Sequence, residues 1–370
     1  MKELYLVVVI PCFNEAQTLV PTCASLGFGI GFDATPVNTF LILVDNNSTD
    51  ATAALAACIA LDSLPGTVII GYEPVQGYVP PRHRGNLLAQ ELAQARHWPL
   101  EHVLLLQADA DTCYTTGYGE SMRAVALASE PNCLLEASAA HWPDFQTAYP
   151  LYAALSDVAD DRFKRLFPSK LSDEVVVDDK ITGYRLSDYF CWGGHQREFT
   201  AQGEEIHAET TRLYIRARAM GALKIAVPQA IALHSARKIL VEPALHLATA
   251  GFPREDSWNY YWRSATASWS LDDLAAHQRK TEIALALRTR ELHLLGLLSI
   301  LPLHVNRALG HLPEAKLAEF ATFCLERLPN RTITDMLHHP GLFLTDIFTL
   351  LQNSGEIVLA KAELHLASSF

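Results

Sequence analysis

The stretch "LLLQADADTCY", residues 104–114, decides the fold because it joins a buried strand to a pair of carboxylates. Three leucines run into Asp109 and Asp111, which are separated by a single residue. Two carboxylates at this spacing repel each other unless a cation or hydrogen-bond donors lie between them. A hard divalent cation would relieve that repulsion, whereas a solvated turn without a ligand is the alternative for so short a motif. The stretch predicts a strand with a polar carboxyl end.

Apolar runs of the same kind precede it. Four runs are nearly continuous in apolar residues, as the strands of a parallel sheet covered on both faces require: "LYLVVVI" (4–10), "FLILVD" (40–45), "GTVIIGY" (66–72) and "HVLLLQAD" (102–109). Helical patterns separate them at 14–26, 48–61 and 85–97. This alternation predicts an α/β fold with a mostly parallel, doubly wound, Rossmann-like sheet. Ligands bind such sheets at the carboxyl ends of the strands, where Asp45 and Asp109 stand.

The second half of the chain has a different texture. A further strand is expected at 132–139, a helix at 204–220, and a late strand and turn at 223–234. After residue 240 the pattern is helical, with helices expected near 272–300, 313–328 and 341–353. We therefore predict a domain over residues 1–240 and an additional α-helical C-terminal region over 241–370.

Charge and composition exclude several classes of protein. The net charge of −12 argues against a nucleic-acid partner, which would need a basic stripe. The seven cysteines are scattered without a C-x-x-C pair, so neither a zinc ribbon nor a disulfide framework is indicated. No run reaches the ~20 apolar residues of a membrane span. A cytoplasmic protein is expected, with peripheral binding at the inner face of the membrane as an alternative.

Four loop motifs occur in a set order with the apolar runs: "PCFNE" (11–15), "VDNNSTDAT" (44–52), "GYVPPRHRGN" (77–86) and "ADAD" (108–111). With them the chain resembles the family 2 glycosyltransferases, which have a GT-A fold. The resemblance covers residues 4–115 and returns at "GEE" (203–205) and "LHSARK" (233–238). It implies a nucleotide-sugar half over 1–115 and an acceptor half over 116–240. The implied activity is inverting, metal-dependent transfer of a sugar from a nucleotide diphosphate, with UDP preferred.

The resemblance assigns the base and ribose of the nucleotide to the first two loops. Pro11, Asn14 and Glu15 would lie along the base and ribose. Asp45 would accept a hydrogen bond from the base edge, which suits the imide N–H of uracil. The family usually has two acidic residues where this chain has Asp45 and Asn46, so one carboxylate remains for the base.

The diphosphate and the metal are assigned to the next two motifs and to a late histidine. Arg82 or Arg84 would face the diphosphate; solvated loop arginines are the alternative. Asp111 would bind Mn²⁺ or Mg²⁺ directly, with Asp109 nearer the ribose and the metal, and His234 as the third protein contact. Imidazole is a softer ligand than Mg²⁺ prefers, which favours Mn²⁺.

The catalytic carboxylate is expected in "GEEIHAETTRL" (203–213), where Glu204, Glu205 and Glu209 are placed at the start of a helix. In the family an acidic pair here carries the general base, so the resemblance implies that Glu205 deprotonates the acceptor hydroxyl, with Glu204 beside it. The alternative is that these acids only stabilise the positive end of the helix dipole.

The acceptor site is expected in "YFCWGGHQREF" (189–199), where Trp192, Gly193 and Gly194 would form a platform for a sugar. A tryptophan packed in the core at a glycine bulge is the alternative. The acceptor would be a saccharide, a lipid-linked molecule or a small molecule. The apolar segment 284–312, flanked by arginines, either lies on a membrane surface or forms core or a homodimer interface.

Two other functions compete with a glycosyltransferase. A sugar nucleotidyltransferase would need a glycine-rich, basic loop directly after the first strand, and "PCFNEAQ" (11–17) is neither glycine-rich nor basic. A non-catalytic nucleotide- or glycan-binding protein on a GT-A scaffold is the second alternative, against which the Asp pair, both arginines and the acidic stretch weigh.

Overall fold

The computed structural model describes residues 3–166, 174–266, 268–311, 313 and 318–367. The chain forms two compact units, each with its own internal packing. The first unit comprises Met1–Ala140, Val177–Arg197 and Ala208–Ser235; the second comprises His141–Val176, Glu198–His207 and Ala236–Phe370. The second unit thus takes two segments that precede residue 240, and the predicted division into functional domains stays a prediction.

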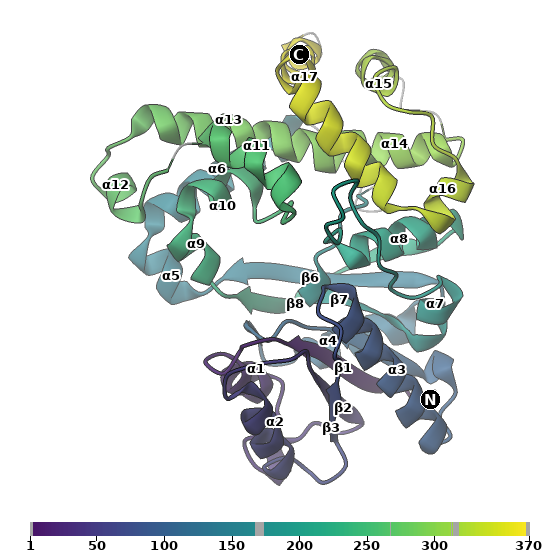
Figure 1. Ribbon diagram of the computed structural model, residues 1–370. Helices are drawn as coiled ribbons and strands as arrows, with labels where there is room; N and C mark the ends of the chain where they lie inside the picture. Colours follow the sequence, from purple (N-terminus) through teal and green to yellow (C-terminus); the bar gives the residue numbers. More distant parts are fainter. Residues whose placement is uncertain (1–2, 167–173, 267, 312, 314–317, 368–370) are drawn as a thin grey trace. The chain divides into compact units, whose positions relative to one another are not determined.

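The first unit is built on an eight-stranded mixed sheet with the order β3-β2-β1-β4-β7-β6-β8-β5 (Figure 1). The strands are β1 Tyr5–Cys12, β2 Thr39–Asp45, β3 Val68–Tyr72, β4 Val103–Gln107, β5 Thr112–Tyr114, β6 Cys133–His141, β7 Thr182–Arg185 and β8 Leu223–His234. The pairs β1–β2, β1–β4 and β2–β3 are parallel. The pairs β4–β7, β6–β7 and β5–β8 are antiparallel. The predicted α/β fold class is confirmed.

The central strands are apolar along their whole length because both faces of the sheet are covered. In β1, Leu6 and Val8 point into one buried cluster, whereas Val7 and Val9 point into another. Side chains alternate between the two faces of a strand, so a strand buried on both faces shows no alternation of apolar and polar residues. This is why the expected strands at 4–10, 40–45, 66–72 and 102–109 match β1 to β4.

Helices and short 3₁₀ turns connect the strands of the first unit. They are α1 Leu19–Ser25, α2 Thr52–Leu61, α3 Val79–Ala95, α4 Tyr118–Ala128, α7 Leu186–Cys191 and α8 Glu209–Ala219, with turns η1 Phe32–Ala34, η2 Leu100–His102 and η4 Asp179–Ile181. The helix expected at 14–26 begins only at Leu19, after Asn14 has adopted a φ of 55°. The helix expected at 85–97 begins at Val79, because the first helical turn tolerates prolines.

The helix expected at 204–220 also begins late, which corrects the placement of Glu204 and Glu205. Gly203 has a φ of 83° and closes a turn in which the Thr200 amide donates to the carbonyl of Glu204 at 2.8 Å. Glu205 then forms an antiparallel bridge with Phe199, and Ala208 takes a left-handed φ of 64° directly before the helix. The acid that starts α8 is Glu209.

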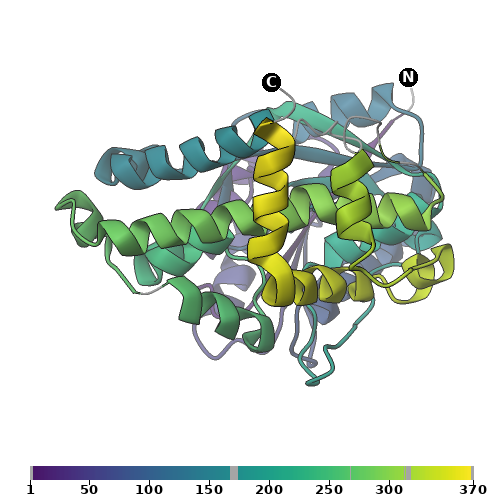
Figure 2. The same ribbon diagram turned by 90° about the horizontal axis from the view of Figure 1, so that it is seen from above.

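The second unit is helical. Its elements are α5 Pro143–Ala148, α6 Pro150–Leu166, α9 Arg237–Val241, α10 Pro243–Thr249, α11 Asp256–Thr266, α12 Leu271–Ala275, α13 Lys280–Leu295, the π-helical turn η5 Gly296–Ile300, α14 Leu301–Ala308, α15 Ala318–Leu325, α16 Ile333–His338 and α17 Gly341–Ala367. Helix α17 packs across α13 and α14 (Figure 2). The predicted helical texture after residue 240 is confirmed, although part of the helix expected at 313–328 lies outside the described residues.

The described part of the apolar segment 284–312 packs in the interior of the second unit. Leu292, Leu295 and Ile300 are buried there. Two of its arginines are bound within the unit: Arg288 pairs with Glu356 at 2.6 Å, and Arg290 contacts Asp160 at 2.8 and 2.9 Å. The core interpretation of this segment therefore holds, and its buried side chains are not available to lipid. In the part of the chain that the structure describes, every helix is too short or too polar to cross a membrane.

Candidate active site in the first unit

The first two loops meet because β1 and β2 run in parallel register, with Cys12 opposite Asp45. The backbone amide of Asn14 donates to the Ser48 hydroxyl at 3.0 Å, and its side-chain oxygen accepts from the amide of Thr49 at 2.8 Å. These bonds join the loop after β1 to the loop after β2. Pro11 lies in β1, one residue before Cys12, so the predicted residues for base and ribose gather at one edge of the sheet.

The difference from the family at residue 46 has a structural explanation. Asp45 is half-buried, and its carboxylate accepts from the Ser48 amide at 3.3 Å. Asn46 is buried, and its side-chain amide donates to the carbonyl oxygens of Glu73 at 2.7 Å and Val75 at 2.8 Å. A carboxylate has no proton with which to make these two bonds. Asn46 therefore holds the loop after β3 in place, and Asp45 is the carboxylate of this pair of positions.

The Asp pair lies in a tight turn between β4 and β5. The amide of Asp109 donates to the Tyr114 hydroxyl at 3.3 Å, and its carbonyl accepts from the amide of Thr112 at 3.3 Å. In the antiparallel pairing of β5 with β8, Thr112 lies opposite His234. Asp111 directly precedes Thr112, so the structure brings the predicted metal ligands Asp111 and His234 to the same end of this strand pair.

Arg82 is enclosed in the first unit, not presented from a loop. Its side chain is 6% exposed; Nη2 donates to Asp109 at 2.5 Å and Nε donates to Glu209 at 2.7 Å. Burial alone would lower the pKa of Arg82, but the carboxylates of Asp109, Asp179 and Glu209 raise it well above its ordinary value. Arg84, by contrast, lies on the more exposed face of α3 and pairs with Glu91 at 2.9 Å. Both arginines belong to α3, which corrects their expected place in a loop.

Two buried acids around Arg82 were not recognised as a pair in the sequence. Asp179, in η4, accepts a hydrogen bond from the amide of Thr210 at 3.1 Å. It offers an oxygen within 4.8 Å of one from Glu209, which is 3% exposed. Burial and then the charge of Glu209 raise the pKa of Asp179 to about 7. Among the described residues the second oxygen of Glu209 has no hydrogen-bond partner. Three carboxyl groups, including Asp109, thus face one guanidinium.

Lys180 is a further charged residue that the sequence analysis missed. Its ammonium donates to the carboxylate of Asp178, and its side chain is 18% exposed. The Tyr114 hydroxyl donates to the carbonyl of Lys180 at 3.1 Å and accepts from the amide of Asp109, so η4 is tied to the Asp turn. "VVVDDK" (175–180) repeats the pattern of residues 104–109, an apolar run that ends in an acid, and this was the available signal.

The predicted acceptor platform is wrong for Trp192. Its ring is 0% exposed, and its indole N–H donates to the side-chain oxygen of Asn132 at 2.8 Å. Gly193 and Gly194 have φ values of 83° and 63°, and they form the turn that follows α7. Arg216 donates to the carbonyl oxygens of Trp192 and Gly194. A buried ring has no face for a sugar, so the core interpretation of this tryptophan is correct.

The predicted catalytic acids Glu204 and Glu205 belong to the second unit. The carboxylate of Glu204 accepts from the amide of Ser257 at 3.2 Å, in the first turn of α11. Glu205 is half-buried in its bridge with Phe199. The carboxylate of Glu204 therefore stabilises the start of a different helix from the one expected.

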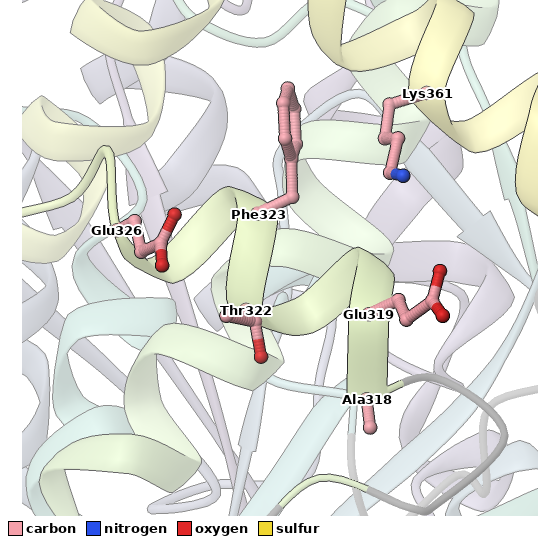
Figure 3. Close-up of a pocket in the computed structure, with 6 residues that line it drawn as sticks. All are labelled: Ala318, Glu319, Thr322, Phe323, Glu326 and Lys361. Carbon is pink, nitrogen blue, oxygen red and sulfur yellow. The ribbon is translucent and has the colours of Figure 1, made fainter.

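Two hollows, one in each unit, contain none of the predicted site residues. One in the first unit, of about 400 Å³, is lined by Leu6, Val8 and Leu106 together with the end of α1 and the start of α4. One in the second unit, of about 410 Å³, is lined by one side of α15, by Glu326 and by Lys361 of α17 (Figure 3). The candidate site is therefore defined by its charged side chains at the sheet edge.

Comparison with known proteins agrees with the resemblance noted in the sequence. Residues 7–117 match the family model described as glycosyl transferase family 2, which confirms the resemblance over this stretch. No curated protein sequence matches the chain. Among solved structures, Staphylococcus aureus TarS 1–349 is 12% identical, with a TM-score of 0.44, over 98% of this chain and 89% of that one. The Pyrobaculum calidifontis mannosyltransferase PcManGT, in complex with GDP-Man and Mn²⁺, is 17% identical, with a TM-score of 0.46, over 94% and 87%.

Proposed function

We propose, from the family 2 glycosyltransferase match over residues 7–117, that this protein is a nucleotide-sugar glycosyltransferase that uses a divalent cation. It moves a sugar from a nucleotide diphosphate, UDP by preference, to an acceptor hydroxyl with inversion at the anomeric carbon. The observation that carries the proposal is the placement of Asp45 and Asp109 after the carboxyl ends of the parallel strands β2 and β4, with Asp111 and His234 at one end of the β5–β8 pair. Polar side chains at this edge are where an open α/β sheet binds a nucleotide.

Asp111 and His234 are the residues that would hold the cation. A carboxylate oxygen and an imidazole nitrogen are both ligands of Mn²⁺, and the imidazole makes Mn²⁺ a better match than Mg²⁺. When bound, the cation would stabilise the charge of the departing diphosphate. Asp109 is held by Arg82 and lies two residues before Asp111 in the same turn. We therefore assign Asp109 to the ribose or to water on the cation.

The nucleotide base is assigned to Asp45, with Pro11, Asn14 and Glu15 along the base and ribose. The Asp45 carboxylate can accept from the imide N–H of uracil. The Asn14 side chain is engaged in joining the two loops, so its role is to shape this part of the site.

Transfer needs one carboxylate that takes the proton of the acceptor hydroxyl. As the acceptor oxygen bonds to the anomeric carbon, the bond from that carbon to the diphosphate breaks and its electron pair leaves with the diphosphate. Glu205 remains the proposed general base. Glu209 is its competitor, because it lies in the same unit as the Asp pair and has one oxygen without a hydrogen-bond partner among the described residues.

The competing functions are less well supported. The loop after β1 is tied down by Asn14 and lacks the glycines and basic residues of a nucleotidyltransferase loop. A non-catalytic binding protein would bind a nucleotide sugar without releasing UDP. Release of UDP with a suitable acceptor, measured over many turnovers, separates the enzyme from the binding protein.

Substitution of Asp111 tests the proposal. A ligand at a hundred times its dissociation constant stabilises a protein by ~2.7 kcal/mol, so UDP with Mn²⁺ should raise the unfolding temperature of the wild type. Asp111→Ala should abolish this stabilisation, because one ligand and its charge are lost. Asp33→Ala, which removes an exposed carboxylate from η1, is the matched control and should keep it. A normal response of Asp111→Ala to UDP and Mn²⁺ would refute the metal assignment.

A further inference from the structure

The cations that the sequence assigned to the diphosphate are already bound by protein. All three nitrogens of the Arg82 guanidinium donate within the first unit: Nε to Glu209, Nη2 to Asp109 and Nη1 to the carbonyl of Ala108 at 3.4 Å. Arg84 pairs with Glu91 on the same helix. The Arg82 side chain is 6% exposed and its guanidinium is held by two carboxylates, so its charge compensates the protein's own anions. The diphosphate needs another cation.

The need is strong because the edge of the sheet is acidic. Asp109, Asp179 and Glu209 share Arg82 as their counter-charge, and Asp178, next to Asp179 in the chain, adds a fourth carboxylate. Bringing a doubly or triply charged diphosphate to this edge adds like charge, which raises the free energy of the complex unless cations compensate it. The divalent cation of the proposed function supplies part of that compensation.

The turn η4 carries another cationic residue, Lys180, at the same edge of the sheet. Asp179–Ile181 packs against β4, which leads into the turn with Asp109, and against α8 and β8, which carry Glu209 and His234. The Tyr114 hydroxyl bonds both to the carbonyl of Lys180 and to the amide of Asp109, so the two backbones are one hydroxyl group apart. Lys180 is therefore positioned by the Asp turn itself.

The Lys180 ammonium is charged, and the side chain that carries it is partly accessible. Burial would lower its pKa, but the carboxylates of Asp178, Asp109 and Asp179 raise it, so the amine keeps its proton at neutral pH. An ammonium has three N–H donors, and the bond to Asp178 uses one of them. Its side chain is 18% exposed and that of Asp178 is 39% exposed, so a ligand at the sheet edge can approach the pair from solvent.

We propose that Lys180 binds the diphosphate of the nucleotide sugar, and that Arg82 instead positions Asp109. This inference rests on the proposed function, because it assigns one more residue to the same donor site. Lys180 makes the contact that the sequence had assigned to an arginine, and the cation and the ammonium share the charge of the leaving group. Arg82 stays between Asp109 and Glu209 with or without the donor.

Binding of UDP, uridine and pyrophosphate tests the proposal with Mn²⁺ present. Calorimetry on the full chain should show that Lys180→Met weakens UDP and pyrophosphate by about tenfold to a hundredfold, the loss of one charge-assisted hydrogen bond. Uridine, which has no phosphate, should bind the variant as it binds the wild type. Lys180→Arg should recover most of the affinity for UDP. Arg96→Met, which removes an exposed cation from the cap of α3, should change none of the three affinities.

Three outcomes overturn the inference, and they differ from failure of the proposed function. Unchanged binding of UDP by a folded Lys180→Met protein removes Lys180 from the site. An equal loss of affinity for UDP and uridine means that the substitution distorts η4 and that the ammonium does not contact phosphate. Recovery with Lys180→Gln instead of Lys180→Arg also contradicts a contact made by charge. If the wild type binds neither UDP nor pyrophosphate, the proposed function fails first.

Discussion

The two units use acidic residues in opposite ways. In the first unit, Asp109, Asp179 and Glu209 gather around the single guanidinium of Arg82, each close to another carboxyl group. In the second unit, Glu198 accepts from the amide of Gly341 at 2.8 Å and Glu204 accepts from that of Ser257, both at the start of a helix.

This difference separates structural acids from candidate functional ones. Backbone amides at a helix start are donors without an intrahelical partner, and the helix dipole favours a negative charge there. The charge of a glutamate in that position is stabilised by backbone amides of its own unit. Carboxyl groups that face one another remain costly until a proton or a cation joins them, so they form the kind of site that binds a ligand.

Glu205 gives the strongest test of this comparison. It is the proposed general base, yet it belongs to the second unit, whose glutamates Glu198 and Glu204 stabilise helix starts. Glu205→Gln keeps the size of the side chain but cannot take a proton, so kcat should fall by ~10²–10⁴ with donor affinity unchanged. The fall in kcat at acid pH should also disappear, because that limb reports the base. Glu204→Gln, beside it, should leave kcat nearly unchanged.

The matched variant in the first unit is Glu209→Gln. A larger fall in kcat for Glu209→Gln than for Glu205→Gln, at equal donor affinity and thermal stability, would place the base in the first unit. The proton transfer would then be assigned to the acids that gather in the first unit, and Glu205 would have no catalytic role.

The second test compares how much the free energy of unfolding falls when Arg82 or Arg84 is replaced. Arg82→Met leaves Asp109, Asp179 and Glu209 without their shared counter-charge, and removal of one partner from a buried ion pair costs ~3–5 kcal/mol. Arg84→Met breaks an exposed pair with Glu91 and should cost ~0–1 kcal/mol. Urea unfolding of the three proteins, followed by near-UV circular dichroism, measures both values. Similar midpoints for the two variants would mean that the acids of the first unit do not depend on Arg82.

The smallest expected effect is the pH dependence that Asp179 imposes on the first unit. Its pKa is about 7 in the folded protein against an ordinary value of 3.8, so the folded state holds a proton that the unfolded state has released. The contribution of protonated Asp179 to stability is therefore lost as pH rises from about 4 to about 7.

Asp179→Asn tests this, because the amide keeps the acceptor for the Thr210 N–H and removes the charge. The variant should gain stability relative to the wild type as pH rises through this window, measured in EDTA so that no divalent cation contributes. A difference between the two proteins that does not change from pH 4 to pH 7 would contradict the raised pKa. Asp33→Asn, on the surface of η1, is the control and should show no such trend.

The sequence predicted the elements of the first unit better than the starts of its helices. Strands β1 to β4 were found because an apolar run is a local property, read from consecutive residues. Helix α8 was placed too early because the three glutamates of residues 204–209 look like the acidic first turn of a helix. The turn at Gly203 and the left-handed Ala208 depend on how the segment 198–207 packs in the second unit.

The sequence alone determined the α/β class, the Asp pair at a strand end and the loops that match family 2, because each of these lies within a short stretch of chain. The partners of the charged side chains were decided by the tertiary structure. Arg82 and Glu209 are 127 residues apart in the chain, and Arg82 and Asp109 are 27 apart. Trp192 is likewise recognisable as core only from its surroundings. The pairing of charged side chains depends on distances that are set by tertiary packing. A pattern of neighbouring residues in the sequence contains no information about those distances.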